Sequence, residues 1–284
     1  MAKIIMVQGT TSDAGKSMIV TGLCRIFRQD GYRVAPFKAQ NLTSNGFLTE
    51  EGLEMGKAQV LQAEAAGTKA KAIMNPILVK PIAKGKMEVV VKGKEWKSPD
   101  GRPYKEHREF FEPMLKGCID ELKKDYDIIV VEGAGSPAEI NIKEGDLVNM
   151  FIAQMCNAPV LLVGDIERGG VFASLVGTLA LLTDDERNLI KGLIINKFRG
   201  NEALLKNGVI SLEEITKKKV MGIVPFLDVD IEPEDSLSIG KNPVAGDEHY
   251  TSDFREKQYD ILAEGIRNSI NIDEIYNLMG LKER

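Results

Sequence analysis

The segment Gly9-Thr10-Thr11-Ser12-Asp13-Ala14-Gly15-Lys16-Ser17 joins a short apolar run to a long amphipathic stretch near the start of the chain. The run at 4–7 predicts a buried strand, and residues 16–29 predict a helix with one apolar face. Glycines between a strand and a helix let backbone N–H groups point at a phosphate, with Lys16 supplying positive charge and Ser17 a hydroxyl for Mg²⁺. A Gly-rich turn alone would not require Lys-Ser after its last glycine, so the segment predicts a nucleotide site. Its predicted binding residues are Gly9, Thr10, Thr11, Ser12, Ala14, Gly15, Lys16 and Ser17.

The alternation of strands and helices continues through the first two thirds of the chain. Predicted strands lie at 33–37, 127–131, 159–163, 192–195 and 220–224, and predicted helices include 108–123, 146–156 and 172–182. Apolar residues in these strands are consecutive, as expected for parallel strands that helices cover on both faces. The pattern predicts an α/β fold with a phosphate loop and a doubly wound, mostly parallel sheet.

Two segments depart from this alternation. Residues 79–106 contain strand-like pieces at 87–91 and around Trp96, and we expect a hairpin insertion there. Residues 228–250 are polar and rich in Pro, Gly and acidic residues, as is typical of a linker. Helical periodicity returns at 252–281, which predicts a C-terminal helical tail.

Composition narrows the classes of partner. The chain has 284 residues, with 37 Lys and Arg against 42 Asp and Glu, and a net charge of −5 at pH 7. It has no overall positive field, so we expect no nucleic-acid partner. Apolar runs are too short for a bilayer, no signal peptide precedes the first strand, and Cys24, Cys118 and Cys156 have neither disulfide nor zinc spacing. We therefore expect a cytoplasmic protein without a membrane partner.

Further candidate residues follow the predicted strands, at the edge of a parallel sheet where ligands collect. Glu132 ends an apolar strand before Gly-Ala-Gly, and its carboxylate can reach Mg²⁺ on bound phosphates. Lys38 follows the second strand and suits a γ-phosphate, although the spacing also allows a solvated lysine. Asn196 suits the edge of adenine, and an Asn that starts a turn fits the sequence nearly as well. Asp165 and Arg168 follow another strand and point to the same edge.

Taken together, these motifs resemble those of the cobyric acid synthases, the glutamine-dependent amidotransferases of cobalamin biosynthesis. The resemblance lies at 7–17, 35–41, 54–59, 74–76, 131–141, 165–172 and 196–200, and it spans essentially residues 1–237. The phosphate loop is one residue longer than the common pattern and has an acid at Asp13. In both features it resembles the loop of the dethiobiotin synthetase-like P-loop proteins, whose acidic loop residue helps to hold the metal.

The resemblance implies ATP-dependent amidation of peripheral carboxylates on adenosylcobyrinic acid a,c-diamide, giving cobyric acid. Each carboxylate would become an acyl phosphate that ammonia then attacks, with ATP and Mg²⁺ as cofactors. By the same analogy the catalytic residues are Lys38, Asp13 and Glu132, and the metal ligands are Asp13, Ser17, Glu54 and Glu132. The implied substrate residues are Gln40, Asn41, Ser136, Pro137, Glu139, Asn141, Asp165, Arg168, Gly169 and Gly170. A homodimer is also expected by analogy.

One departure from the family concerns the glutaminase domain, which normally follows the synthase domain and needs a Cys nucleophile and a His base. No Cys follows Cys156, and His249 is the one later His. The chain passes from a synthase domain at 1–237 through a linker at 238–251 to a helical segment at 252–284 that resembles the family's extreme C-terminus. We expect it to use free ammonia or a glutaminase on a separate chain.

Two other functions stay open. An amidoligase-like enzyme could act on a different carboxylate, and a ParA/MinD-like protein could use the same loop as a non-catalytic ATP switch. The switch predicts a second lysine early in the loop and a surface for membrane or DNA. No lysine precedes Lys16 in the loop, and the C-terminal helix is not strongly basic. Corrinoid amidation is therefore the favoured interpretation.

Overall fold

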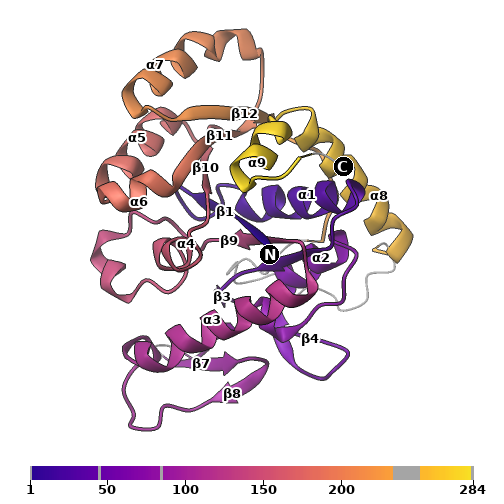
Figure 1. Cartoon of the computed structure of the whole chain (residues 1–284), viewed down its shortest axis with the longest axis vertical. Helices are drawn as coiled ribbons and strands as arrows, with labels where there is room; N and C mark the ends of the chain where they lie inside the picture. Colours follow the sequence, from indigo (N-terminus) through magenta and orange to yellow (C-terminus); the bar gives the residue numbers. More distant parts are fainter. Residues whose placement is uncertain (1, 44–45, 84–85, 233–249, 283–284) are drawn as a thin grey trace.

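Six parallel strands form the central sheet of this computed structural model, which describes residues 2–43, 46–83, 86–232 and 250–282. The strands are β1 (Lys3–Gly9), β2 (Val34–Phe37), β9 (Ile128–Glu132), β10 (Val160–Asp165), β11 (Ile190–Phe198) and β12 (Lys219–Pro225). They are ordered β12-β11-β10-β1-β9-β2, and each neighbouring pair is parallel. The predicted parallel α/β fold is confirmed (Figure 1).

Two apolar cores lie on opposite faces of this sheet, because successive strand residues point to opposite sides. On β1, Ile4 and Met6 pack into one core, whereas Ile5 and Val7 pack into the other. The first core is covered by α3 (Arg108–Asp125), α4 (Met150–Cys156) and α5 (Val171–Leu181), and the second by α1 (Lys16–Gln29), α8 (Ser252–Arg267) and α9 (Ile272–Met279). Burial on both faces explains the consecutive apolar residues of the strands.

A second, four-stranded sheet lies at one end of the long axis, towards the bottom of Figure 1. It contains β3 (Gln40–Leu42), β6 (Ile77–Ala83), β7 (Lys86–Val91) and β8 (Lys94–Trp96), in the order β3-β6-β7-β8. The predicted hairpin is present as β7 and β8, but it belongs to this larger sheet. Strand β6, which was not predicted, contains Pro81. This proline lies beyond the residues of β6 that pair with β3, so its missing N–H breaks no bond to that strand.

Shorter elements complete the described part of the chain: β4 (Gly46–Leu48), β5 (Glu54–Gly56), α2 (Lys57–Ala65), α6 (Asp184–Leu189), α7 (Lys206–Thr216) and 3₁₀ turns at Ala72–Met74, Tyr104–Glu106, Ile140–Gly145 and Glu202–Leu205. Helix α4 begins at Met150, later than the predicted residue 146. The reason is that the Asp146 carboxylate accepts hydrogen bonds from the backbone N–H groups of Val148 and Asn149, at 2.9 Å and 2.8 Å. These bonds hold the chain in a turn before the helix.

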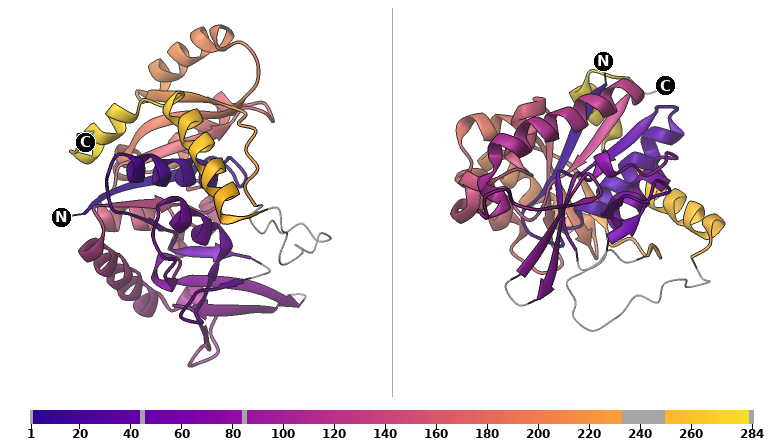
Figure 2. Two further views of the ribbon diagram at one scale, coloured as in Figure 1. Left: turned by 90° about the vertical axis from the view of Figure 1, so that its right-hand side faces the viewer. Right: turned by 90° about the horizontal axis from the view of Figure 1, so that it is seen from below.

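The predicted C-terminal helical tail is present as α8 and α9, and it packs on α1 as part of the second core. Arg25 of α1 donates hydrogen bonds to Glu256 and Asp260 of α8, each at 2.7 Å. Figure 2 shows α8 beside α1. Of the linker predicted at 238–251, residues 238–249 lie outside the described part of the chain.

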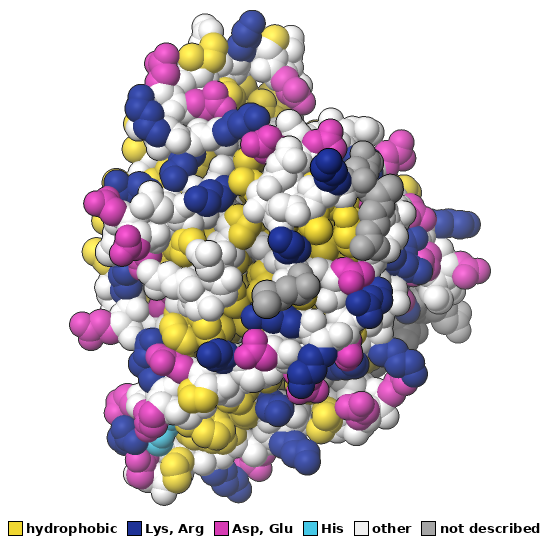
Figure 3. Space-filling model, in the orientation of Figure 1, with side chains coloured by type: hydrophobic (Ala, Val, Ile, Leu, Met, Phe, Trp, Pro, Cys, Tyr) yellow, Lys and Arg dark blue, Asp and Glu magenta, His cyan; other side chains and the backbone are white. Residues whose placement is uncertain are grey.

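Charged side chains of both signs are interspersed over the face drawn in Figure 3. This mixture agrees with the small net charge of −5. Among the residues that the structure describes, no helix combines the length and the apolar character needed to cross a membrane.

Candidate active site

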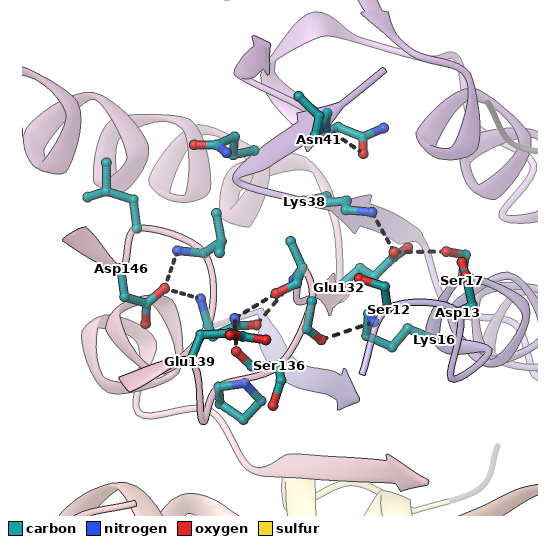
Figure 4. A pocket seen from close by; sticks show the side chains of 18 of the residues that line it. Ser12, Asp13, Lys16, Ser17, Lys38, Asn41, Glu132, Ser136, Glu139 and Asp146 are labelled. Atoms are coloured by element: carbon teal, nitrogen blue, oxygen red, sulfur yellow. Dashed lines mark hydrogen bonds and ion pairs between the residues drawn. The ribbon is translucent and has the colours of Figure 1, made fainter. Parts of the chain in front are cut away.

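A cavity of about 950 Å³ opens where the carboxyl ends of β1, β2 and β9 meet. Parallel strands place the residues that follow them at one edge of the sheet, so segments far apart in sequence converge there. Its walls include the phosphate loop, residues after β2 and the loop after β9 (Figure 4). The predicted site residues that line it are Ser12, Asp13, Gly15, Lys16, Ser17, Lys38, Gln40, Asn41, Glu132, Ser136, Pro137 and Glu139.

A left-handed glycine and a lysine shape the phosphate loop. Gly15 has a φ of 92°, and a Cβ atom there would come within 2.1 Å of Asn196 Nδ2. Glycine fits without displacing Asn196, whose side-chain amide donates to a loop carbonyl at 2.9 Å. Lys16 Nζ donates to the carbonyls of Thr11, at 2.9 Å, and Gly135, at 3.2 Å. Lys16 is the first residue of α1, and the N-terminus of a helix favours a bound anion.

Glu132 is a fully buried carboxylate on the inner wall of the cavity. Its Oε1 accepts hydrogen bonds from Ser17 Oγ at 2.8 Å and from Lys38 Nζ at 2.7 Å, and its Oε2 accepts one from Gln62 Nε2 at 2.5 Å. Burial raises the pKa of the Glu132 carboxyl, but the Lys38 charge and the three hydrogen bonds outweigh burial and hold this pKa below its ordinary value. Glu132 is therefore ionised at neutral pH.

Ser17 and Glu132 place two oxygen atoms side by side, the ligand type that Mg²⁺ prefers. Within the described ranges, no group of three or more His, Cys, Asp or Glu side chains gathers for a metal. Mg²⁺ at phosphate sites commonly uses one or two protein groups together with phosphate oxygens and water, so this pair fits the ion. Asp13, a further predicted ligand, has a side chain that is 74% exposed and lies 3.7 Å from Arg168.

An ionic network at the rim joins the phosphate loop to the ends of β10 and β11. Lys197 Nζ donates to the Asp13 carbonyl at 2.6 Å and to Asp165 Oδ2 at 2.9 Å. Burial raises the pKa of Asp165, but hydrogen bonds from Lys197 and from the Glu167 N–H, with the charges of Lys197 and Arg168, bring it below its ordinary value. The network fixes the outer part of the loop relative to the sheet.

The loop after β9 is held by Asn149, which no sequence motif singled out. Asn149 Nδ2 donates to the carbonyls of Ala134, at 2.7 Å, and Ser136, at 3.3 Å, while its Oδ1 accepts from the Ala134 N–H at 3.1 Å. Gly133 leaves room for this side chain, because a Cβ atom there would come within 2.4 Å of Asn149 Oδ1. These contacts fix the wall of the cavity at 134–139.

Several predicted residues do not line the large cavity. Glu54, predicted as a metal ligand, lies on β5 and pairs with Lys80 at 2.9 Å, and it does not line the cavity that holds Ser17 and Glu132. Asn141 lines a second, smaller cavity. The other predicted residues outside the lining of the large cavity are Gly9, Thr10, Thr11, Ala14, Asn196, Asp165, Arg168, Gly169 and Gly170.

Gln62 is a functional candidate that sequence reasoning missed. It lies on α2, outside the 54–59 stretch of the family resemblance, and reaches Glu132 from the far side of the carboxylate. Gln59 is buried one turn earlier on the same helix. Buried glutamines are uncommon, and Gln59 Nε2 and Gln62 Oε1 have no hydrogen-bond partner in the described part of the chain. The sequence signal that could have identified Gln62 was this pair of polar residues on the inner face of α2.

A phosphate loop that ends in Lys-Ser at the start of a helix, facing a buried carboxylate on a parallel sheet, defines a P-loop nucleotide-binding protein. The chain belongs to the CobQ/CobB/MinD/ParA nucleotide binding domain family, whose model matches residues 5–237.

Cobyric acid synthases are among the relatives of this chain. The cobyric acid synthase of Thermoanaerobacter sp. (strain X514) is 54% identical over 238 residues, and that of Streptococcus sanguinis (strain SK36) is 52% identical over 239 residues. Each alignment covers 84% of this chain but only 47% and 48% of the respective relative, so the chain spans about half their length. Among solved structures, the MinD cell division protein of Aquifex aeolicus aligns over 94% of this chain and 96% of its own, at 13% identity and a TM-score of 0.44.

Proposed function

We propose that this chain is an ATP-dependent carboxylate–amine ligase of the cobyric acid synthase type, which amidates corrinoid side-chain carboxylates through acyl phosphates. One observation carries the proposal: the phosphate loop opens into the same cavity as the 134–139 wall, in a region 54% identical to a cobyric acid synthase. A volume of about 950 Å³ lies at the upper end of the range for ligand pockets, which leaves room for a second substrate beside the phosphates.

The proposed reaction has two steps, and in each step one bond forms as another breaks. A substrate carboxylate oxygen bonds to the γ-phosphorus as the bond to ADP breaks, and the nitrogen lone pair of ammonia then bonds to the carboxyl carbon as phosphate leaves and a proton is lost. Bound MgATP supplies the phosphoryl group. Lys16 and Lys38 would place positive charge beside that group, where charge shifts during transfer. Ser17 and Glu132 would hold Mg²⁺, and Glu132 also holds the Lys38 side chain in place.

Other residues take roles by the same proposal. Gln40, Asn41 and Glu139 offer polar groups to the corrinoid, since they line the cavity. Asp13 stays a candidate for the metal or for catalysis, at the rim beside Lys197. The nitrogen source would be free ammonia or a separate glutaminase chain.

ADP release by the pure chain tests the proposal. MgATP and adenosylcobyrinic acid a,c-diamide are supplied with either ammonium or glutamine, and we expect ADP release only when both corrinoid and ammonium are present. Lys38→Met should lower the rate by at least about a hundredfold. ADP release that ignores the corrinoid would favour the ATP switch, and release with a different polycarboxylate alone would favour an amidoligase of other specificity. Turnover on glutamine alone would contradict the proposed nitrogen source.

We further propose that residues 1–237 form the synthase unit, that 238–251 form a linker, that 252–284 form a helical segment packed on it, and that the chain is a homodimer. The packing of α8 on α1 through Arg25 supports a firm attachment of the last segment. Proteolytic cleavage at 238–249 should therefore leave α8 associated with the rest, as native mass measurement would reveal. Light scattering should give about twice the mass of 31.3 kDa.

A further inference from the structure

A second cavity, of about 450 Å³, adjoins the large one. Its lining residues are Lys105, Ile140, Asn141, Ile142, Glu144 and Gly145. Three of these, Lys105, Ile142 and Gly145, also line the large cavity, so the two cavities share a wall. A ligand that extends well beyond its reacting group could therefore occupy both.

Lys105 differs from the other lysines of the large cavity in its partners. Each of the others is held by an acceptor: Lys16 by the Thr11 carbonyl at 2.9 Å, Lys38 by Glu132 at 2.7 Å, Lys143 by Glu186 at 2.6 Å and Lys197 by Asp165 at 2.9 Å. Lys105 is exposed and makes no side-chain hydrogen bond or ion pair with another described residue. Its positive charge is therefore available to an anionic ligand.

Two contacts fix the backbone next to Lys105. The hydroxyl of Tyr104 donates to Gln40 Oε1 at 3.1 Å, and Gln40 lines the large cavity. The Tyr104 ring also packs edge-on against the buried Phe111 of α3, with centroids 6.1 Å apart. The turn that carries Lys105 is thus attached to both β3 and α3, so the lysine has a defined place at the junction of the cavities.

Two apolar side chains also line the second cavity. Ile140 and Ile142 are 62% and 52% exposed, on the loop that also carries Glu139 and leads to Asp146 in Figure 4. Exposed isoleucines beside a cation suit a ligand with an apolar face and an anionic substituent. Corrinoids combine a large ring with peripheral carboxylates. Glu144 lies in the same cavity and repels an anion, which favours the Lys105 end for a carboxylate.

We propose that Lys105 is a specificity-determining residue, which binds one carboxylate of the polyacid substrate in the second cavity while another carboxylate of the same molecule lies at Lys38. The inference rests on the proposed function and adds to it the residue that distinguishes substrate from product. Because amidation removes the negative charge that Lys105 binds, the contact is lost as the remaining carboxylates are converted. The chain should therefore bind the substrate, which carries more carboxylates, more tightly than the amidated product.

Equilibrium binding of the corrinoid, followed by its own visible absorbance, tests the inference. Lys105→Ala should weaken binding of adenosylcobyrinic acid a,c-diamide roughly five- to tenfold, and Lys105→Arg should restore most of the loss. Glu144→Gln, which removes the opposing charge from the same cavity, should tighten binding. Lys94→Ala is the matched control, because Lys94 is an exposed lysine on β8 that lines neither cavity. In steady state, Lys105→Ala should raise KM for the corrinoid and leave KM for ATP unchanged.

The amidated product, cobyric acid, is the second probe. Lys105→Ala should reduce the preference of the chain for substrate over product, whereas a purely structural role would weaken both ligands alike. The inference is overturned if Lys105→Ala binds the corrinoid as tightly as the wild-type chain does and keeps the same preference for substrate over product. The proposed function would then stay intact. A wild-type chain that binds no corrinoid would overturn the proposed function itself.

Discussion

At the scale of single residues, the donors around Glu132 divide between its two oxygens. Oε1 accepts from Ser17 and Lys38, on the side of the phosphate loop, whereas Oε2 accepts from Gln62, on the side of α2. Gln62 therefore fixes the rotation of the carboxylate without itself lining the large cavity. We interpret it as a positioning residue for the Ser17–Glu132 pair that fits Mg²⁺.

Gln62→Leu removes one donor and should raise the pKa of the Glu132 carboxyl. A hydrogen bond to a charged group contributes about 1.5–3 kcal/mol, or roughly one to two pKa units. Since Glu132 must be ionised to hold Mg²⁺, the acidic limb of the kcat/KM profile should move to higher pH by about this amount. Gln59→Leu on the same helix is the control, because Gln59 makes no hydrogen bond to Glu132 in the described part of the chain, and its limb should stay in place. An unmoved limb in Gln62→Leu would contradict the positioning role.

Gly15→Ala should damage the nucleotide site specifically. Its left-handed φ of 92° strains any residue with a Cβ atom, and the new methyl group would come within 2.1 Å of Asn196. We expect nucleotide affinity, measured by calorimetry, to fall by at least about tenfold, or about 1.4 kcal/mol. Gly31→Ala has a similar φ of 82° but nothing within 4 Å of the added Cβ atom. This control should lower stability by about 1 kcal/mol and leave nucleotide binding unchanged.

At the scale of elements, the C-terminal helices are attached to the sheet edge through Gly222 of β12. A single antiparallel bridge joins Gly222 to Ile270, in the connection between α8 and α9. A Cβ atom at Gly222 would come within 2.1 Å of the Ser269 carbonyl oxygen and within 2.8 Å of Ile270 Cα. Both atoms belong to backbone, which cannot rotate away.

Gly222→Ala should therefore separate the α8–α9 connection from β12 and lower the free energy of unfolding by about 1–3 kcal/mol. The matched control is Gly177→Ala in α5, where an added Cβ atom meets nothing within 4 Å. That substitution should raise stability by about 0.5–1 kcal/mol, because alanine favours the helix over glycine. Urea unfolding measures both. Equal effects of the two substitutions would show that α8 and α9 are not held at this edge.

Elements with a strong local signal were predictable, and those defined by tertiary contacts were not. The helix predicted at 16–29 matches α1, because its apolar spacing and the preceding loop both define it. Strand β6 was missed, and its Pro81 is unfavourable inside a strand because it lacks an N–H. The structure shows that Pro81 lies beyond the residues of β6 that pair with β3. The start of α4 was placed too early although its cause is local, because the turn that Asp146 forms before the helix was not recognised.

At the scale of the whole molecule, stability should depend on pH through carboxyl groups whose pKa the fold lowers, among them three buried ones. The pKa values of Glu132, Asp165 and Glu186 all lie below their ordinary values. Burial raises the pKa of Glu186, but hydrogen bonds from Lys143 and Thr183 lower it by more than burial raises it. A lowered folded pKa contributes stability that is present above the unfolded pKa and is lost as the pH falls through the folded one. Tm should therefore decrease below about pH 4. A Tm that increases between pH 5 and pH 3 would contradict these ionic contacts.

The candidate site was predictable to the extent that it lies at the ends of strands. Lys16, Ser17, Lys38 and Glu132 all follow parallel strands of one sheet, and the structure brings them together as the sheet rule requires. Gln62 lies on α2 and Lys105 lies on a turn before α3. No local sequence pattern predicts where these two elements lie relative to the edge of the sheet. Glu54 matched a family motif, yet it pairs with Lys80.

One measurement tests the central claim most directly: mass spectrometry of the corrinoid after incubation of the pure chain with MgATP and nitrogen-15-labelled ammonium. The account predicts that labelled nitrogen enters the corrinoid as amide, with one ADP released for each amide formed. Lys38→Met should incorporate no label above background. ADP release without label in the corrinoid, or tight nucleotide binding without corrinoid-dependent turnover, would contradict the account and indicate another substrate or a nucleotide-driven switch.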